Sequence, residues 1–169
     1  MTTVQQSPVT AAGLASLAFS RRVVNKLVDA CPENSYTHQA CEGANHVTWN
    51  LGHLAWTDDY FLTALAGQAS SLPAGWAEKF GMQTKPVGDS AAYPPAGEVR
   101  RVFNETRERL IAWFESMDDE QLGAELPDNL KGFAPTFGAL MGSMAAHEGM
   151  HAGQITVARR SLGLNPVME

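Results

Sequence analysis

Apolar residues recur every three or four positions in four long segments of the 169-residue chain. This period is typical of amphipathic helices, and we predict helices over roughly 8–30, 45–66, 99–117 and 137–162. No segment alternates apolar and polar residues as a strand bordered by hairpin turns would. Four such helices without a sheet bury their apolar faces against one another. The pattern therefore predicts an all-α four-helix bundle that forms a single domain over residues 1–169.

The second and third predicted helices are joined by a long segment, residues 68–93, which is rich in Gly, Pro and Ser. It also carries the aromatic residues Trp76, Phe80 and Tyr93. A loop of this length is uncommon unless it has a function, such as closing a pocket. A long link also permits the two helices to run parallel, so we expect a crossover connection between them.

Charge and hydropathy narrow the classes of partner. The net charge is −6, and basic residues occur in short pairs such as Arg21-Arg22 rather than in the stripe that phosphate binding needs. No run of about 18 apolar residues is present. We therefore expect neither nucleic acid nor a membrane as a partner. The N-terminus lacks the charged region of a secretory signal, so we expect Cys31 and Cys41 to be reduced thiols in a cytoplasmic protein.

The stretch HEGMH, from His147 to His151, matches the H-E-x-x-H pattern of zinc proteases. Residues i and i+4 lie one above the other on a helix, so the two imidazoles can reach one ion. They also fall within the apolar stripe between Met144 and Ile155, where unpaired imidazoles would be unfavourable. Either a shared metal or separate hydrogen bonds would satisfy them.

A third histidine, His53, lies in WNLGHLAW on the second predicted helix. It shares a helix face with Trp49, Trp56 and Tyr60, and therefore points to an apolar, aromatic surface. Metal sites in helical bundles are built from side chains on facing helices, so His53 can join the HEGMH pair at one ion. The alternative for His53 alone is a core histidine that is hydrogen-bonded to a carbonyl.

His46 is the rival ligand on the same helix. It precedes His53 by seven residues, which is two turns or about 10 Å along the helix axis. One ion cannot bind both side chains. We expect His46 at the surface near the start of the helix, with the mouth of a pocket as the alternative, and we assign no role to His38.

The protease interpretation requires another ligand downstream of the HEGMH stretch. Only 18 residues follow His151; they contain no histidine, and their one carboxylate side chain is that of Glu169. Glu148 lies about 100° around the helix from His147, so it need not face the ion. We expect Glu148 to form a salt bridge or to support a ligand at the pocket, with a general base as the alternative.

Two segments, HVTWNLGHLAWTDDYFL and AAHEGMHAGQITVARRSLGL, resemble the DinB/YfiT-like superfamily of metal-dependent enzymes. The W-x-L-G-H element is most similar to the subset that also supplies the N-terminal domain of ergothioneine-forming sulfoxide synthases. The similarity continues through LPAGWAEKFG, YPPAGEV and MDDEQL, and so covers nearly the whole chain. The resemblance implies a four-helix bundle whose middle link crosses over, and a metal triad that maps to His53, His147 and His151.

The resemblance also implies a range of activities. Known members include thiol-dependent transferases and isomerases that use bacillithiol, mycothiol or glutathione, and homodimers are common.

Three imidazoles leave a coordination position open, so we expect one divalent transition metal, zinc or nickel, with iron as a further option. The expected pocket for a small-molecule substrate, a low-molecular-weight thiol among the candidates, is lined by Trp49, Trp56, Tyr60 and Glu148.

Three functional hypotheses follow. The first is a metal-dependent enzyme, either a thiol-dependent transferase or a small-molecule hydrolase. The second is a non-catalytic bundle in which the ion is structural. The third, which has the least support, is a protease.

Overall fold

The computed structural model describes residues 7–167, and these form helices and connecting segments without a strand. This part of the chain contains six α-helices: α1 (Pro8–Asp29), α2 (Val47–Ala66), α3 (Trp76–Phe80), α4 (Ala96–Glu115), α5 (Asp119–Gly123) and α6 (Phe137–Ser161). Two 3₁₀ turns, η1 (Glu33–Ser35) and η2 (Ser90–Ala92), lie in the connections, and Glu125 and Thr136 form an isolated antiparallel bridge. The prediction of an all-α chain is confirmed.

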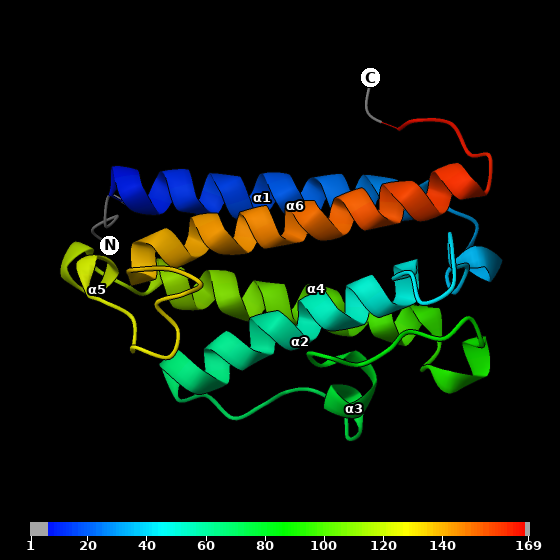
Figure 1. The fold of residues 1–169 in the computed structure, drawn as a ribbon. Helices are drawn as coiled ribbons and strands as arrows, with labels where there is room; N and C mark the ends of the chain where they lie inside the picture. Colours follow the sequence, from blue (N-terminus) through cyan, green and yellow to red (C-terminus); the bar gives the residue numbers. More distant parts are fainter. Residues whose placement is uncertain (1–6, 168–169) are drawn as a thin grey trace.

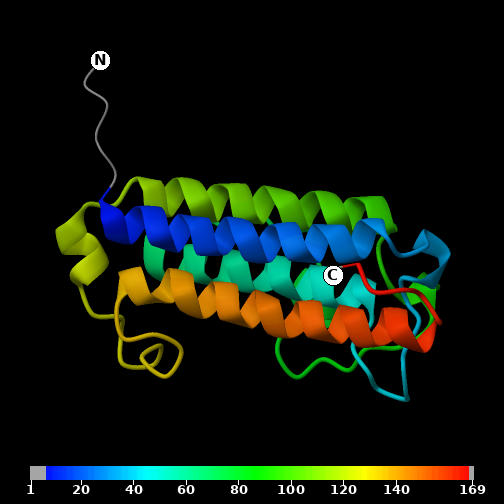
Figure 2. The same cartoon turned by 90° about the horizontal axis from the view of Figure 1, so that it is seen from above.

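The four long helices form two layers. Helix α1 packs against α6 in one layer, and α2 packs against α4 in the other (Figures 1 and 2). The sequence colours in Figure 1 show that the chain runs one way in α1 and α6 and the opposite way in α2 and α4. No helix in the described part of the chain combines the length and hydropathy that a membrane crossing requires.

The helix ends follow local capping chemistry. Thr136 caps α6 by accepting a hydrogen bond from Ala139 N, and α2 ends at Gly67, which adopts the left-handed conformation with φ of 64°. Helix α4 begins three residues earlier than the sequence pattern predicted. The reason is that the carbonyl of Pro95 already accepts hydrogen bonds from the backbone N–H groups of Glu98 and Val99.

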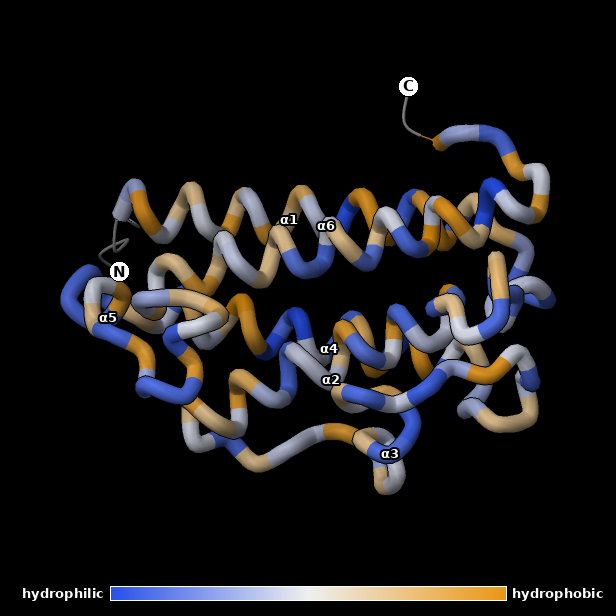
Figure 3. The backbone as a smooth tube through the Cα atoms, in the orientation of Figure 1, coloured by the Kyte–Doolittle hydropathy of each residue, from blue (hydrophilic) through white to orange (hydrophobic). Residues whose placement is uncertain are grey.

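The core contains two apolar clusters, one toward each end of the long helices. The first includes Val24, Leu27, Leu51, Leu54, Trp76, Phe80, Phe103 and Ile155. The second includes Leu17, Phe61, Leu62, Leu110, Phe114, Leu140, Met141 and Met144. Blue, hydrophilic segments interrupt the orange ones along the long helices in Figure 3.

Between the two apolar clusters lies a layer of buried charge, to which each long helix contributes one side chain. These are Arg21 of α1, Asp58 of α2, Arg107 of α4 and Glu148 of α6. Two positive and two negative charges make the layer neutral overall. A buried charge is tolerable only when it is paired and hydrogen-bonded, so this layer favours the one alignment of the four helices that brings all four groups together.

Hydrogen bonds hold the link between α2 and α4 in place where it leaves α2. The Asp59 carboxylate accepts hydrogen bonds from Ser70 Oγ and Ser71 N, and Arg109 of α4 donates to Asp59 Oδ1 and to the Ala69 carbonyl. From there the link returns along α2 and carries α3, which packs against α2 (Figure 1). This arrangement places the α3 backbone close to the first of the three histidines.

Candidate metal centre

The structure brings His53, His147 and His151 together between α2 and α6. One ring nitrogen from each lies within 4.8 Å of the other two, and the Nε2 atoms of His147 and His151 are 3.1 Å apart. A tetrahedral ion with bonds of about 2.0–2.1 Å to three imidazoles needs nitrogens about 3.4 Å apart. The observed spacing therefore fits a shared ion after small side-chain adjustments.

The His53 ring is fixed by a hydrogen bond to α3 and by stacking within α2. Its Nδ1 lies 2.8 Å from the carbonyl oxygen of Phe80, at the end of α3, and the Trp49 indole stacks on the ring at 4.6 Å between centroids and 9° between planes. A carbonyl can only accept, so Nδ1 carries the proton and Nε2 keeps a lone pair. A hydrogen bond from the second ring nitrogen of this kind is the usual support of a metal-binding histidine.

The His151 ring is fixed in the same way, by side chains. Its Nδ1 lies 2.6 Å from Asn50 Oδ1 and 3.1 Å from Gln154 Oε1. The Asn50 amide is oriented because its nitrogen donates to the His46 carbonyl at 3.0 Å. Both partners of Nδ1 are thus acceptors, so His151 also holds its proton on Nδ1 and presents an Nε2 lone pair to His147.

The three imidazoles are neutral at neutral pH. Burial, followed by repulsion from the neighbouring imidazoles, lowers the pKa of His151 to about 3, and the same causes lower the pKa of His147 to about 4. Burial also lowers the pKa of His53. Neutral imidazole is the form that binds a metal. In the absence of a metal, His147 must carry its proton on Nε2 and donate it to the Nε2 lone pair of His151. The residues present therefore fit a divalent ion.

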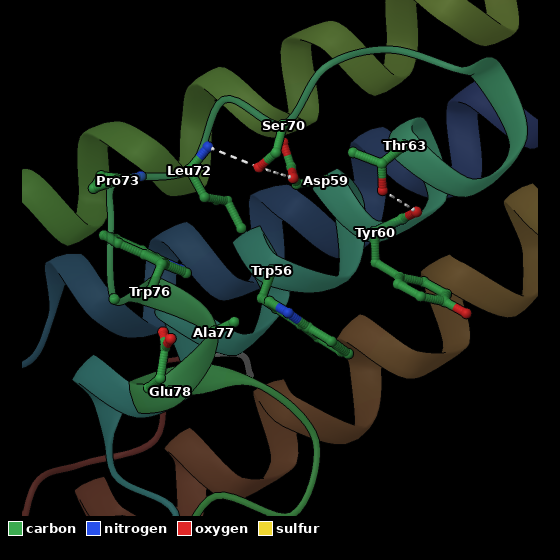
Figure 4. A pocket seen from close by; sticks show the side chains of 11 residues that line it. Trp56, Asp59, Tyr60, Thr63, Ser70, Leu72, Pro73, Trp76, Ala77 and Glu78 are labelled. Atoms are coloured by element: carbon green, nitrogen blue, oxygen red, sulfur yellow. Dashed lines mark hydrogen bonds between the residues drawn. The ribbon is translucent and has the colours of Figure 1, made fainter.

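The aromatic residues predicted to share the face of His53 do so. Ring centroids are 5.7 Å apart for His53 and Trp56, and 5.5 Å for Trp56 and Tyr60, with the planes stacked in both pairs. Trp56 and Tyr60 line a cavity of about 270 Å³ whose other walls come from α2 and from residues 70–78 of the link (Figure 4). Trp49 instead lies behind His53, buried, and donates its indole N–H to Thr84 Oγ1.

A family model of the DinB superfamily matches residues 16–155, a range that contains all three histidines and most of α1 and α6. The chain belongs to the DinB superfamily. No protein in the search of curated sequences matches it. The match confirms the resemblance seen in the two histidine-bearing segments, and in this DinB protein those segments are the helices that hold the candidate site.

Glu148 points away from the three histidines in this DinB protein. Its side chain is fully buried, and Oε2 accepts hydrogen bonds from Ser20 Oγ and from Arg107 Nη1. Oε1 lies 2.6 Å from Arg21 Nε, a charge contact without the alignment of a hydrogen bond. The structure thus places Glu148 in the buried charge layer between α1 and α4. Glu148 does not line the cavity beside Trp56.

The expectation of a surface position for His46 is wrong. The side chain is fully buried, because residues of the link cover it. Its Nδ1 accepts a hydrogen bond from Trp49 N and so caps α2, while its Nε2 donates to the Val87 carbonyl at 3.0 Å. His38 lies outside the site and bonds to Ser161 Oγ.

Two partners of the histidines had no clear sequence signal. Asn50 is adjacent to Trp49 in the W-x-L-G-H element, but an asparagine inside a helix has many other roles. The Phe80 carbonyl is a backbone group, which no residue pattern reveals. Both are recognisable only from their distance to an imidazole nitrogen.

Proposed function

We propose that His53, His147 and His151 bind one divalent transition metal and that the protein is a metal-dependent enzyme, a thiol-dependent transferase or a small-molecule hydrolase. The observation that carries this proposal is the convergence of three neutral imidazoles, two of which have their outer nitrogen already hydrogen-bonded. Zinc and nickel are the metals we expect first, then iron, because all three accept imidazole ligands. The fold we assign to the chain is the four-helix bundle of the DinB type, with residues 67–95 as its crossover.

Catalysis is supported by the number of ligands. The group of candidate ligands found among residues 7–167 has three members, and three protein ligands with an open position are typical of catalytic rather than structural zinc sites. An ion bound there would lower the pKa of a coordinated water or thiol toward neutrality. Trp56 would orient an apolar substrate group, since it contacts both His53 and the adjacent cavity.

The proposal is tested by metal analysis of the purified protein. We expect about one ion per chain in the wild type and a strong loss in His53→Ala and in His151→Ala. His38→Ala is the matched control, because His38 lies outside the site, and it should retain the metal. Equal metal content in wild type and His151→Ala would refute the assignment. The reaction is then sought by screening glutathione, bacillithiol and mycothiol against small electrophiles.

A structural ion is the second candidate function. Its support is that His53 and His151 are only 7% and 6% exposed and that an ion would join α2 to α6. Removal of the metal by a chelator separates the two candidates. If the ion is structural, its removal should greatly lower the stability of the protein. If the ion is catalytic, the metal-free protein should stay folded and lose only its activity.

We further propose a homodimer that acts in the cytosol. The dimer is implied by the resemblance to the DinB superfamily, and the outer surface of α1 and α6 offers an apolar groove beside Phe19, which is 55% exposed. Both cysteines are free thiols, the state that a reducing cytosol maintains. Sedimentation at micromolar concentration tests the dimer, and a monomer there would refute it.

A further inference from the structure

The link between α2 and α4 contacts the ring-bearing face of α2 at three successive points. The Phe80 carbonyl accepts from His53 Nδ1, Thr84 Oγ1 accepts from Trp49 Nε1, and the Val87 carbonyl accepts from His46 Nε2. The first contact determines which nitrogen of His53 carries the proton. The orientation of this proposed ligand therefore depends on how closely α3 approaches α2.

Gly52 is the residue that permits this approach. Its carbonyl accepts a hydrogen bond from Trp76 Nε1 at 3.0 Å, and the Phe80 ring lies directly over its Cα. A Cβ added at Gly52 would be 2.2 Å from Phe80 Cδ1 and 2.4 Å from Cε1, far inside van der Waals contact. Neither ring can move easily, because Trp76 and Phe80 are packed against each other in the core, with 2% and 0% exposure.

Three glycines of α6 provide a contrast. A Cβ added at Gly142, Gly149 or Gly153 of α6 would meet no atom within 4 Å. Glycine in a helix interior is unfavourable relative to alanine, so its presence at position 52 is explained by close packing rather than by helix formation.

We propose that Gly52 is a positioning residue for the metal site: it seats α3 on α2, so that the Phe80 carbonyl holds His53 in the Nδ1–H tautomer with Nε2 directed at the ion. The inference rests on the proposed metal-binding function. It assigns the long link a role in the geometry of the site, in addition to forming one side of the cavity beside Trp56.

The test combines tautomer and affinity measurements on Gly52→Ala. Imidazole ¹⁵N NMR of the metal-free wild type should show His53 as a single Nδ1–H tautomer. In Gly52→Ala we expect a mixture of tautomers and a metal affinity lower by about 10–100-fold, the usual effect of losing such a hydrogen bond. Gly153→Ala is the control, because it makes the same substitution in open space two residues from His151. It should keep the wild-type tautomer and affinity.

If Gly52→Ala does not fold, a milder variant tests the same role of Gly52. Trp76→Phe removes the indole N–H that donates to Gly52 but keeps a ring in the core, and we expect it to populate the second tautomer partially and to weaken metal binding several-fold. The inference is overturned if the folded variant retains both the single tautomer and the wild-type affinity. A wild type that binds no metal would instead refute the proposed function, and the tautomer measurement on the metal-free protein would still decide the role of Gly52.

Discussion

Arg107 Nη1 donates to Glu148 Oε2 at 3.0 Å inside the core, where the two side chains are 4% and 0% exposed. Glu148 follows His147 in the sequence, but consecutive helical residues do not share a face. The carboxylate therefore belongs to the buried charge layer, and the imidazole before it belongs to the histidine cluster. In an H-E-x-x-H protease the glutamate would act on water at the metal, so the contact with Arg107 argues for a different use of the same spacing.

We predict that Glu148→Gln reduces stability much more than metal binding. The substitution leaves Arg21 and Arg107 with Asp58 as the one carboxylate of the layer, and breaking a buried ion pair typically costs about 3–5 kcal/mol. Urea unfolding should show a loss in this range. Metal content should stay near that of the wild type, whereas His53→Ala should lose most of its metal.

Glu105→Gln is the matched control for this prediction. Glu105 pairs with Arg101 on the surface of α4, where both side chains are more than half exposed, so its removal should change stability by less than about 1 kcal/mol. If an activity is found, loss of a general base would lower its rate about 10²–10⁴-fold. A loss of that size in Glu148→Gln, with fold and metal intact, would show that Glu148 is the base after all.

Stability should fall on acidification because of His46. Burial lowers the pKa of His46 to about 4, although its hydrogen bond to Val87 opposes the shift, and the unfolded side chain titrates near 6.5. Between about pH 6.5 and pH 4 the unfolded state binds a proton that the folded state does not. The contribution of His46 is therefore fully present above about pH 6.5 and is lost as the pH falls toward 4.

His46→Asn isolates this effect. Asparagine is a good helix cap and does not titrate, so it can accept from Trp49 N at all pH values. We expect the unfolding free energy of the variant to decline less steeply between pH 6.5 and pH 4 than that of the wild type. Parallel pH profiles for the two proteins would contradict the prediction.

A third prediction concerns Asn50. Leucine has a similar volume to asparagine but cannot accept the Nδ1 proton of His151, so in Asn50→Leu the ring loses its shortest hydrogen bond and keeps only the longer contact with Gln154. We expect metal affinity to fall about 10–100-fold, measured by competition with a chelator. Gln154→Leu should have a smaller effect, because its contact with the same nitrogen is longer and Asn50 remains. Equal affinities in wild type and Asn50→Leu would refute the role of the amide.

Periodicity predicted the four long helices because each repeats its apolar pattern over five or more turns. The two short helices, α3 and α5, were not predicted, since five residues make little more than one turn and show no period. Helix α5 does carry a local signal, a capping box between Asp118 and Gln121. Such a cap indicates where a helix would begin, but it does not show that a segment of five residues forms a stable helix.

The sequence by itself determined which imidazoles lie on one face of a helix, because the 3.6-residue repeat fixes the direction of each side chain: His147 with His151, and His53 with Trp49, Trp56 and Tyr60. It also separated Glu148 from His147. Only the tertiary structure decided that Glu148 meets Arg21 and Arg107, that His46 is covered, and that Phe80 and Asn50 hold the outer nitrogens of two histidines. These contacts join residues that are at least 27 positions apart in the sequence, and they depend on how the helices and the link align, which no local repeat encodes.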